Sequence, residues 1–93
     1  MLTCVVVPVA VDESEDDVAA LTSSIKSIVP NVQFYFGVDE DYDNPWLLKY
    51  GSVIRVNGFG VGKALETALR EAIKDGCDYV IKSDAHIVFK EFE

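Results

Sequence analysis

Asp84 and His86, which flank Ala85, are the residues whose types and spacing most directly suggest chemistry. His86 is the only histidine in the chain. A carboxylate oxygen and an imidazole nitrogen at the end of a strand can converge on one cation, and this pair of donors suits Mn²⁺ or a similar borderline ion. Such a metal would bridge the two phosphates of a nucleotide diphosphate and stabilise the charge that develops as the diphosphate leaves. The spacing alone favours a polar turn with a solvated aspartate and histidine.

Acidic residues form two clusters, which give the chain much of its net charge of −8. The first cluster comprises Asp12, Glu13, Glu15, Asp16 and Asp17. Because carboxylates are favourable in the first turn of a helix, we interpret it as a solvated helix start. The second cluster follows an apolar segment and comprises Asp39, Glu40, Asp41 and Asp43.

The glycine-rich turn Asn57–Gly62 matches neither of two common nucleotide motifs. A P-loop would need glycine where Asn57 stands and serine or threonine where Ala64 stands. A dinucleotide fingerprint would need a third glycine at Lys63, and it belongs after the first strand of the fold. Two interpretations stay open: a tight connection between strand and helix, or close approach of the backbone to a ligand with Lys63 near a phosphate.

The elements that must position these residues alternate along the chain. Apolar runs predict strands at Leu2–Val9, Val32–Val38, Ser52–Val56 and Tyr79–Ser83. Helical spacing predicts one helix between Ser14 and Pro30, a short turn at Pro45–Tyr50, and a long helix from the glycine turn to Gly76. Strands that alternate with helices predict a parallel sheet with right-handed crossovers. The alternating stretch Ile87–Phe92 predicts a short further strand.

This order of elements places the candidate residues at one edge of the sheet. In open parallel sheets, ligands bind outside the carboxyl ends of the strands. The segments that follow the four predicted strands are Pro8–Val11, Asp39–Asp43, the glycine turn and Asp84–His86. We therefore expect the polar candidates to gather at the carboxyl edge.

Composition narrows the classes of partner. A chain of 93 residues, 49% hydrophobic, is one domain with enough apolar material for a core. Its acidity argues against nucleic acid as a main partner, and no apolar run approaches the roughly 18 residues of a membrane span. The segment Met1–Ala10 lacks a basic start and a cleavage site, so we expect a strand there and a cytoplasmic protein.

The spacing of Cys4 and Cys77 fits no metal motif, and the default is two reduced, buried thiols.

Four motifs, in order, resemble those of GT-A-fold glycosyltransferases, particularly the large inverting, family-2-like group. They are Val5–Val9, Phe36–Glu40, Asn57–Gly58 leading into a helix with Ala64, Ala68 and Ala72, and Tyr79–His86. The Asp-x-His form is similar to the variant of the DxD motif in polypeptide N-acetylgalactosaminyltransferase-like enzymes. Each motif is loose by itself, whereas four in sequence are more specific.

The resemblance implies a three-layer α/β/α fold with a mostly parallel four-stranded sheet in the order 3-2-1-4. This would be a truncated GT-A, Rossmann-like domain that spans residues 1–93 and binds a nucleotide-diphosphate sugar, in particular a UDP-sugar. The resemblance also implies a role for each site residue. Pro8 and Val9 would line the base pocket, Asp39 would hold the uracil or ribose edge, Asn57, Gly58 and Lys63 would lie near the base and diphosphate, and Asp84 and His86 would bind Mn²⁺ or Mg²⁺.

The chain also departs from the family, whose catalytic domains are considerably longer. The acceptor site, a further metal ligand and the catalytic base normally lie after the DxD-type motif, so no catalytic residue is carried over. The leading hypothesis is a glycosyltransferase or its donor-binding half, with assembly as a homo-oligomer open. The alternatives are a non-catalytic nucleotide-binding or assembly module of the same fold, and a small signalling domain of flavodoxin-like type.

The resemblance has one consequence for the cysteines. In this fold the first strand lies beside the fourth, Cys4 is near the start of the first, and Cys77 just precedes the fourth. Their Cα atoms could then fall within the roughly 4.4–6.8 Å that a disulfide needs. We hypothesise a bond between them, as the alternative to two free thiols.

Overall fold

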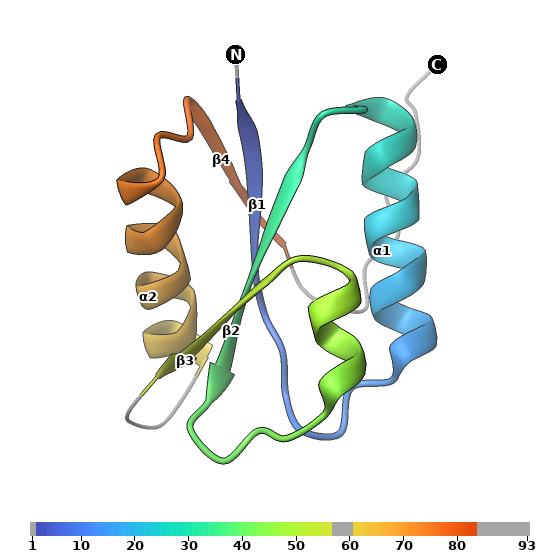
Figure 1. Cartoon of the computed structure of the whole chain (residues 1–93), viewed down its shortest axis with the longest axis vertical. Helices are drawn as coiled ribbons and strands as arrows, with labels where there is room; N and C mark the ends of the chain where they lie inside the picture. The colour runs from blue at the N-terminus through green and yellow to red at the C-terminus, as the bar shows by residue number, and fades with distance from the viewer. Residues whose placement is uncertain (1, 57–60, 84–93) are drawn as a thin grey trace.

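A four-stranded, wholly parallel sheet forms the centre of the molecule (Figure 1). The structure is a computed structural model, and it describes residues 2–56 and 61–83. The strands are β1 (Thr3–Pro8), β2 (Gln33–Asp39), β3 (Ser52–Val56) and β4 (Tyr79–Lys82), and their order across the sheet is β3-β2-β1-β4. The other elements are α1 (Glu15–Ile28), the 3₁₀ helix η1 (Pro45–Lys49) and α2 (Val61–Lys74). The predicted α/β class, the parallel sheet and the order 3-2-1-4 are confirmed.

Helix α1 covers one face of the sheet. The Ser14 hydroxyl accepts a hydrogen bond from the Asp17 amide at 3.1 Å, so the predicted cap starts this helix. Alternate residues of β1 and β2 face the helix and bury their side chains against it. This core includes Val5, Val7, Phe34 and Phe36 from the strands, Val18, Leu21 and Ile25 from α1, and Leu47 from η1.

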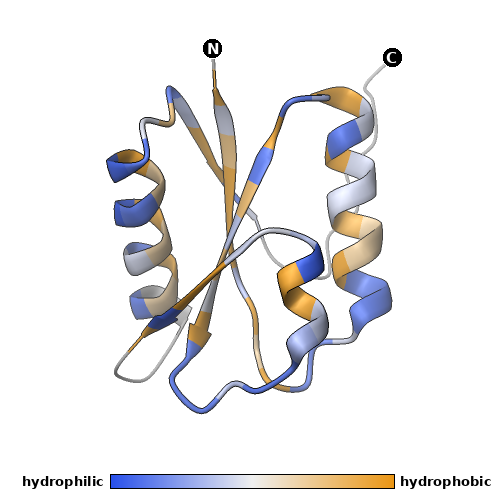
Figure 2. Cartoon of the chain, viewed as in Figure 1, coloured by the Kyte–Doolittle hydropathy of each residue, from blue (hydrophilic) through white to orange (hydrophobic). Residues whose placement is uncertain are grey.

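Helix α2 covers the other face, which completes the three predicted layers. The remaining alternate residues of the inner strands point toward it: Cys4, Val6 and Tyr35 are buried against Ala68 and Ala72. Because alanine side chains are short, the helix can lie close to the sheet. Figure 2 shows hydrophilic residues along the outer side of α2 and in the first turn of α1, and it shows the central strands as largely hydrophobic.

The first turn of α2 lies directly against β2 at Gly37. A Cβ atom added to Gly37 would lie 2.8 Å from the carbonyl carbon of Ala64 and would also meet its oxygen. Only glycine leaves room for this contact. The contact fixes the start of α2 against the carboxyl end of β2.

A disulfide joins Cys4 to Cys77, with 6.0 Å between their Cα atoms. The default of two reduced thiols was wrong, and the hypothesis of a bond is confirmed. The physical reason is the sheet order: β1 and β4 are neighbours, and Cys4 is paired in register with Val80. The amides of Asp78 and Tyr79 both donate to the Leu2 carbonyl, which brings Cys77 beside the start of β1.

Element bounds differ from the sequence expectations by one residue at several ends. β2 begins at Gln33 rather than Val32, because the Val32 amide bonds to the Val29 carbonyl in the preceding turn. β1 ends at Pro8, whose ring nitrogen has no hydrogen to donate. The expected strand at Ile87–Phe92 lies outside the described residues. Within residues 2–56 and 61–83, no helix is both long and apolar enough to cross a membrane.

Candidate functional site at the carboxyl edge of the sheet

The carboxyl ends of all four strands lie at one edge of the sheet because every pairing is parallel. The chain moves outward from β1 to β3 and then returns across the sheet to β4, on the other side of β1. Helices α1 and α2 lie on opposite faces (Figure 1). The strand order therefore reverses between β1 and β4, and open α/β sheets bind ligands at such a reversal point.

Pro8 and Val9 lie on one side of this reversal point. Pro8 is paired in register with Gly37 and is partly exposed. The Val9 amide donates to the Gly37 carbonyl at 2.9 Å, and the Val9 side chain is buried in the core beneath α1. Of the two residues predicted to line a base pocket, Pro8 is thus the one whose side chain reaches the surface.

Ser83 lies on the other side of the reversal point. Its amide donates to the Val6 carbonyl at 3.1 Å, which continues the pairing of β4 with β1 by one residue. Ser83 is 8% exposed, so the chain stays buried and paired with β1 up to the residue before Asp84. Asp84 and His86 themselves, like Asn57 and Gly58, lie outside the described residues.

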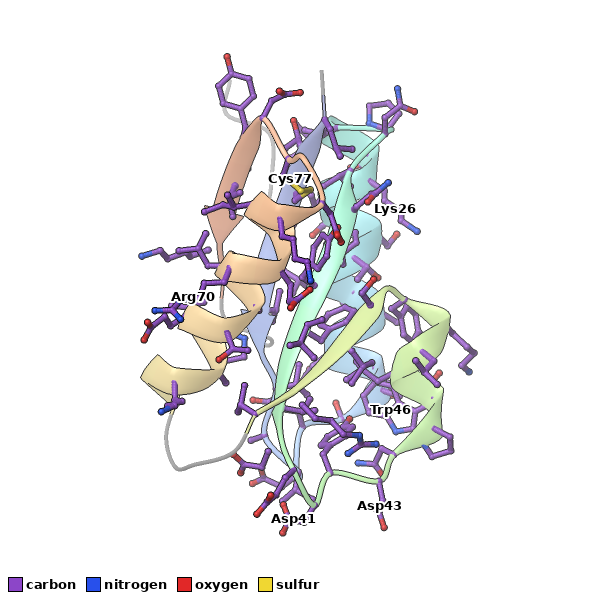
Figure 3. The ribbon with its side chains drawn as sticks, turned by 60° about the vertical axis from the view of Figure 1, so that its left-hand side comes forward. Lys26, Asp41, Asp43, Trp46, Arg70 and Cys77 are labelled. Carbon is purple, nitrogen blue, oxygen red and sulfur yellow. A yellow bond between two sulfur atoms is a disulfide. The ribbon has the colours of Figure 1, made fainter. Side chains whose placement is uncertain are left out.

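Asp39 ends β2 at the same edge, one strand away from the reversal point. It is paired in register with Val56 of β3, and its side chain is exposed. Its carbonyl accepts a hydrogen bond from the Tyr42 amide at 3.1 Å, which closes a turn directly after the strand. The acidic loop, which we define as residues 40–44, continues from this turn. Figure 3 shows Asp41 and Asp43 at the opposite end of the ribbon from Cys77.

Lys63 lies in the first turn of α2, where its side chain is exposed. The neighbouring Ala64 is the residue that contacts Gly37, two positions before Asp39. The start of α2 and the end of β2 are therefore adjacent. The positive end of the helix dipole adds to the charge of Lys63 in favouring an anion here.

The sequence analysis did not identify Tyr42, which lies within the acidic loop, or Arg55, which contacts the loop from β3. Both contribute to an open cleft of about 310 Å³, whose other walls are Asp43, Asn44, Pro45, Leu48 and Val53. The Tyr42 ring is buried, and its hydroxyl has no hydrogen-bond partner within the described residues. Burial raises the pKa of Tyr42, the nearby Asn44 side chain opposes this rise, and the charge of Asp43 adds to it. Arg55 gave no sequence signal, because an arginine is common in an edge strand. Tyr42 did give one, since it is an aromatic residue among acidic residues.

The described residues contain no cluster of three or more acidic, histidine or cysteine side chains that could hold a metal ion. The predicted metal pair lies outside them, so its geometry is not part of this observation. Comparisons with protein-family models, with curated proteins and with solved structures found no significant match.

Proposed function

We propose that this chain is the donor-binding half of a glycosyltransferase, which binds a nucleotide-diphosphate sugar at the carboxyl edge of its sheet. The proposal depends chiefly on one observation. The order β3-β2-β1-β4 reverses between β1 and β4, and Ser83, which precedes the Asp-x-His motif, is buried at the carboxyl end of β4 beside β1. A ligand at this reversal point would meet residues from at least two strands.

The predicted site residues would each contact one part of the nucleotide-sugar donor or its metal. Pro8 would form a wall for the base, and Asp39, exposed at the end of β2, would accept a hydrogen bond from the uracil or the ribose. Lys63 and the start of α2 would face the diphosphate. Asp84 and His86 would hold Mn²⁺ or Mg²⁺, which supplies positive charge to the two phosphates.

The acidity of this edge explains why a metal would be needed. Asp39 and the acidic loop place four carboxylates beside the site, and the cations near them are Lys63 at the start of α2 and Arg55, which contacts the loop. A diphosphate would be repelled by these charges unless a bound cation compensates for them. We therefore expect UDP to bind much more weakly when no divalent metal is present.

Calorimetry of the protein with UDP and with a panel of nucleotide sugars, with and without Mn²⁺, tests the proposal. We expect binding in the presence of Mn²⁺, at least a tenfold weaker affinity without it, and a comparable loss in Asp84→Ala and His86→Ala. Glu66→Gln is the matched control, because it removes a carboxylate from the exposed face of α2. Equal affinity with and without Mn²⁺, or no binding of any nucleotide sugar, would contradict the proposal.

An assay of UDP release from the same protein distinguishes an enzyme from a module that only binds nucleotide sugars. With a UDP-sugar and Mn²⁺ present, release of UDP over time would indicate hydrolysis or transfer. Binding without any release would favour the non-catalytic nucleotide-binding module. Absence of both would favour a domain in which Asp39 and Asp84 are ordinary surface acids.

A further inference from the structure

Arg55 is the cation that contacts the acidic loop. It lies on β3, paired in register with Val38, the residue before Asp39. Its Nη1 donates hydrogen bonds to the carbonyls of Tyr42 and Glu40, the latter at 3.4 Å. Residues 37–48 contain no lysine or arginine, so the loop supplies no positive charge of its own.

Electrostatic repulsion within the acidic loop favours its opening when the Arg55 contact is absent. Asp39, Glu40, Asp41 and Asp43 fall within five consecutive positions, and their like charges repel one another. Two features oppose that repulsion. The buried ring of Tyr42 anchors the middle of the loop in the core beneath α1, and the Arg55 guanidinium holds the carbonyls of Glu40 and Tyr42, on either side of Asp41.

We infer that Arg55 is a positioning residue for Asp39. The turn that follows Asp39 closes through the hydrogen bond from the Tyr42 amide to the Asp39 carbonyl. Arg55 holds the far side of the same turn through the Tyr42 carbonyl, so it fixes the direction in which the chain leaves β2. The Asp39 carboxylate is thereby kept at the carboxyl edge before a ligand arrives. The ligand part of this inference rests on the proposed function, whereas the effect on the loop does not.

Amide hydrogen exchange of the unliganded protein tests the effect on the loop. In Arg55→Gln, we expect exchange at residues 40–44 to accelerate about tenfold, because one charge-assisted contact is lost there. Exchange at Val5–Val7 in β1 should not change. Arg70→Gln is the matched control, since Arg70 donates from an exposed guanidinium to Glu66 on α2, away from the loop. Unchanged exchange at residues 40–44 would overturn the inference whether or not the protein binds nucleotides.

The affinity for UDP with Mn²⁺ tests the positioning of Asp39. We expect Arg55→Gln to weaken binding about tenfold and Arg55→Lys, which retains a positive donor, to recover part of the loss. In the Asp39→Asn background, the additional loss from Arg55→Gln should nearly disappear, because the two residues act through one contact. An undiminished loss in that background would show that Arg55 acts independently of Asp39 and would overturn the inference. If the unmodified protein binds no nucleotide, the proposed function fails, and the exchange measurement still decides the role of Arg55 in the loop.

Discussion

At the amino edge of the sheet, three links join segments that are far apart in the sequence. The Cys4–Cys77 disulfide connects β1 to the segment before β4. The Tyr35 hydroxyl donates to the Asp75 carboxylate at 2.9 Å, and the Leu2 amide donates to Asp78 at 2.7 Å. All three hold the carboxyl end of α2 and the start of β4 against the inner strands.

At the carboxyl edge, the connections are of another kind. Arg55 donates to two loop carbonyls, the Asn44 amide donates to the Val11 carbonyl at 3.3 Å, and Gly37 lets the start of α2 approach β2. No covalent link occurs at this edge within the described residues. The candidate site therefore lies at the end that charge and local packing hold, whereas the opposite end is cross-linked. Weaker constraints therefore act on the carboxyl edge than on the cross-linked amino edge.

Removal of the disulfide should have the largest effect on stability. The bond closes a loop across 73 positions, and such a closure reduces the entropy of the unfolded chain by an amount worth about 4 kcal/mol. The double variant Cys4→Ala/Cys77→Ala should lose about this much of its free energy of unfolding, measured by urea titration. The unmodified protein in excess dithiothreitol provides the control and should show a similar loss. Equal stability with and without the bond would remove the asymmetry between the two edges.

Gly37→Ala should have the next largest effect, and it falls at the carboxyl edge. The new Cβ would meet the backbone of Ala64, which cannot move without displacing the start of α2. We expect a loss of about 2–3 kcal/mol in the free energy of unfolding, measured in urea.

Gly76→Ala is the matched control for Gly37→Ala. Gly76 has no atom near its added Cβ, so its cost comes from its φ of 90° alone, about 1 kcal/mol. A smaller loss for Gly37→Ala than for Gly76→Ala would show that the close contact of α2 with β2 does not constrain this edge.

The fold could be predicted from the sequence because its signals are local and repeat. The valine-rich run of β1, the Ser14 cap and the alanine spacing of α2 each indicate one element, and the alternation of elements indicates a parallel sheet. The strand order came from the resemblance, because local patterns do not say which strand lies beside which. The disulfide depended on that order and could not be decided from the spacing of the cysteines.

The candidate site was only partly predictable. The rule for parallel sheets correctly placed Asp39 and the start of α2 at one edge. It could not identify Arg55, since an arginine in a strand looks the same whether it points to solvent or to a carbonyl. Gly37 had a visible signal, as glycine inside a strand often marks close approach of another backbone, but only the packing shows that Ala64 is its neighbour.

Tyr35→Phe removes a link at the amino edge without creating a cavity. The variant lacks the hydroxyl that donates to Asp75, and we expect a loss of about 1 kcal/mol in the free energy of unfolding at pH 7. Burial, followed by the hydrogen bond to Asp75, raises the pKa of Tyr35 to about 12. The neutral form is thus favoured in the folded protein, so this contribution is complete below pH 10 and is lost as the pH rises from about 10 to about 12.

Urea titrations at pH 9 and pH 11.5 measure this pH dependence. The stability of the unmodified protein should fall between the two values, and that of Tyr35→Phe should fall less. An equal decline in both proteins would exclude the Tyr35–Asp75 link as a source of alkaline sensitivity.

Glu15→Gln should have the smallest effect, and it concerns the contact that joins the start of α1 to η1. The Glu15 carboxylate accepts from Lys49 Nζ at 2.7 Å and from the Tyr50 hydroxyl at 2.8 Å, and these two partners lower the pKa of Glu15. A lowered pKa means that the contribution is present at neutral pH and is lost as the pH falls through the acidic range. Since the ion pair is exposed to solvent, salt should weaken it further.

The measurement for Glu15→Gln compares urea midpoints at pH 7 and pH 3, in low and high salt. The variant should be slightly less stable than the unmodified protein at pH 7 in low salt, and the difference should vanish at pH 3, where the carboxyl group of the unmodified protein is protonated. Glu66→Gln, which removes the pair of Glu66 with Arg70 within α2, provides the control for loss of a surface ion pair inside one helix. A loss for Glu15→Gln greater than that for Tyr35→Phe would mean that the α1–η1 contact stabilises the protein more than the Tyr35–Asp75 link of the amino edge does. The contrast between the two edges would then rest on the disulfide alone.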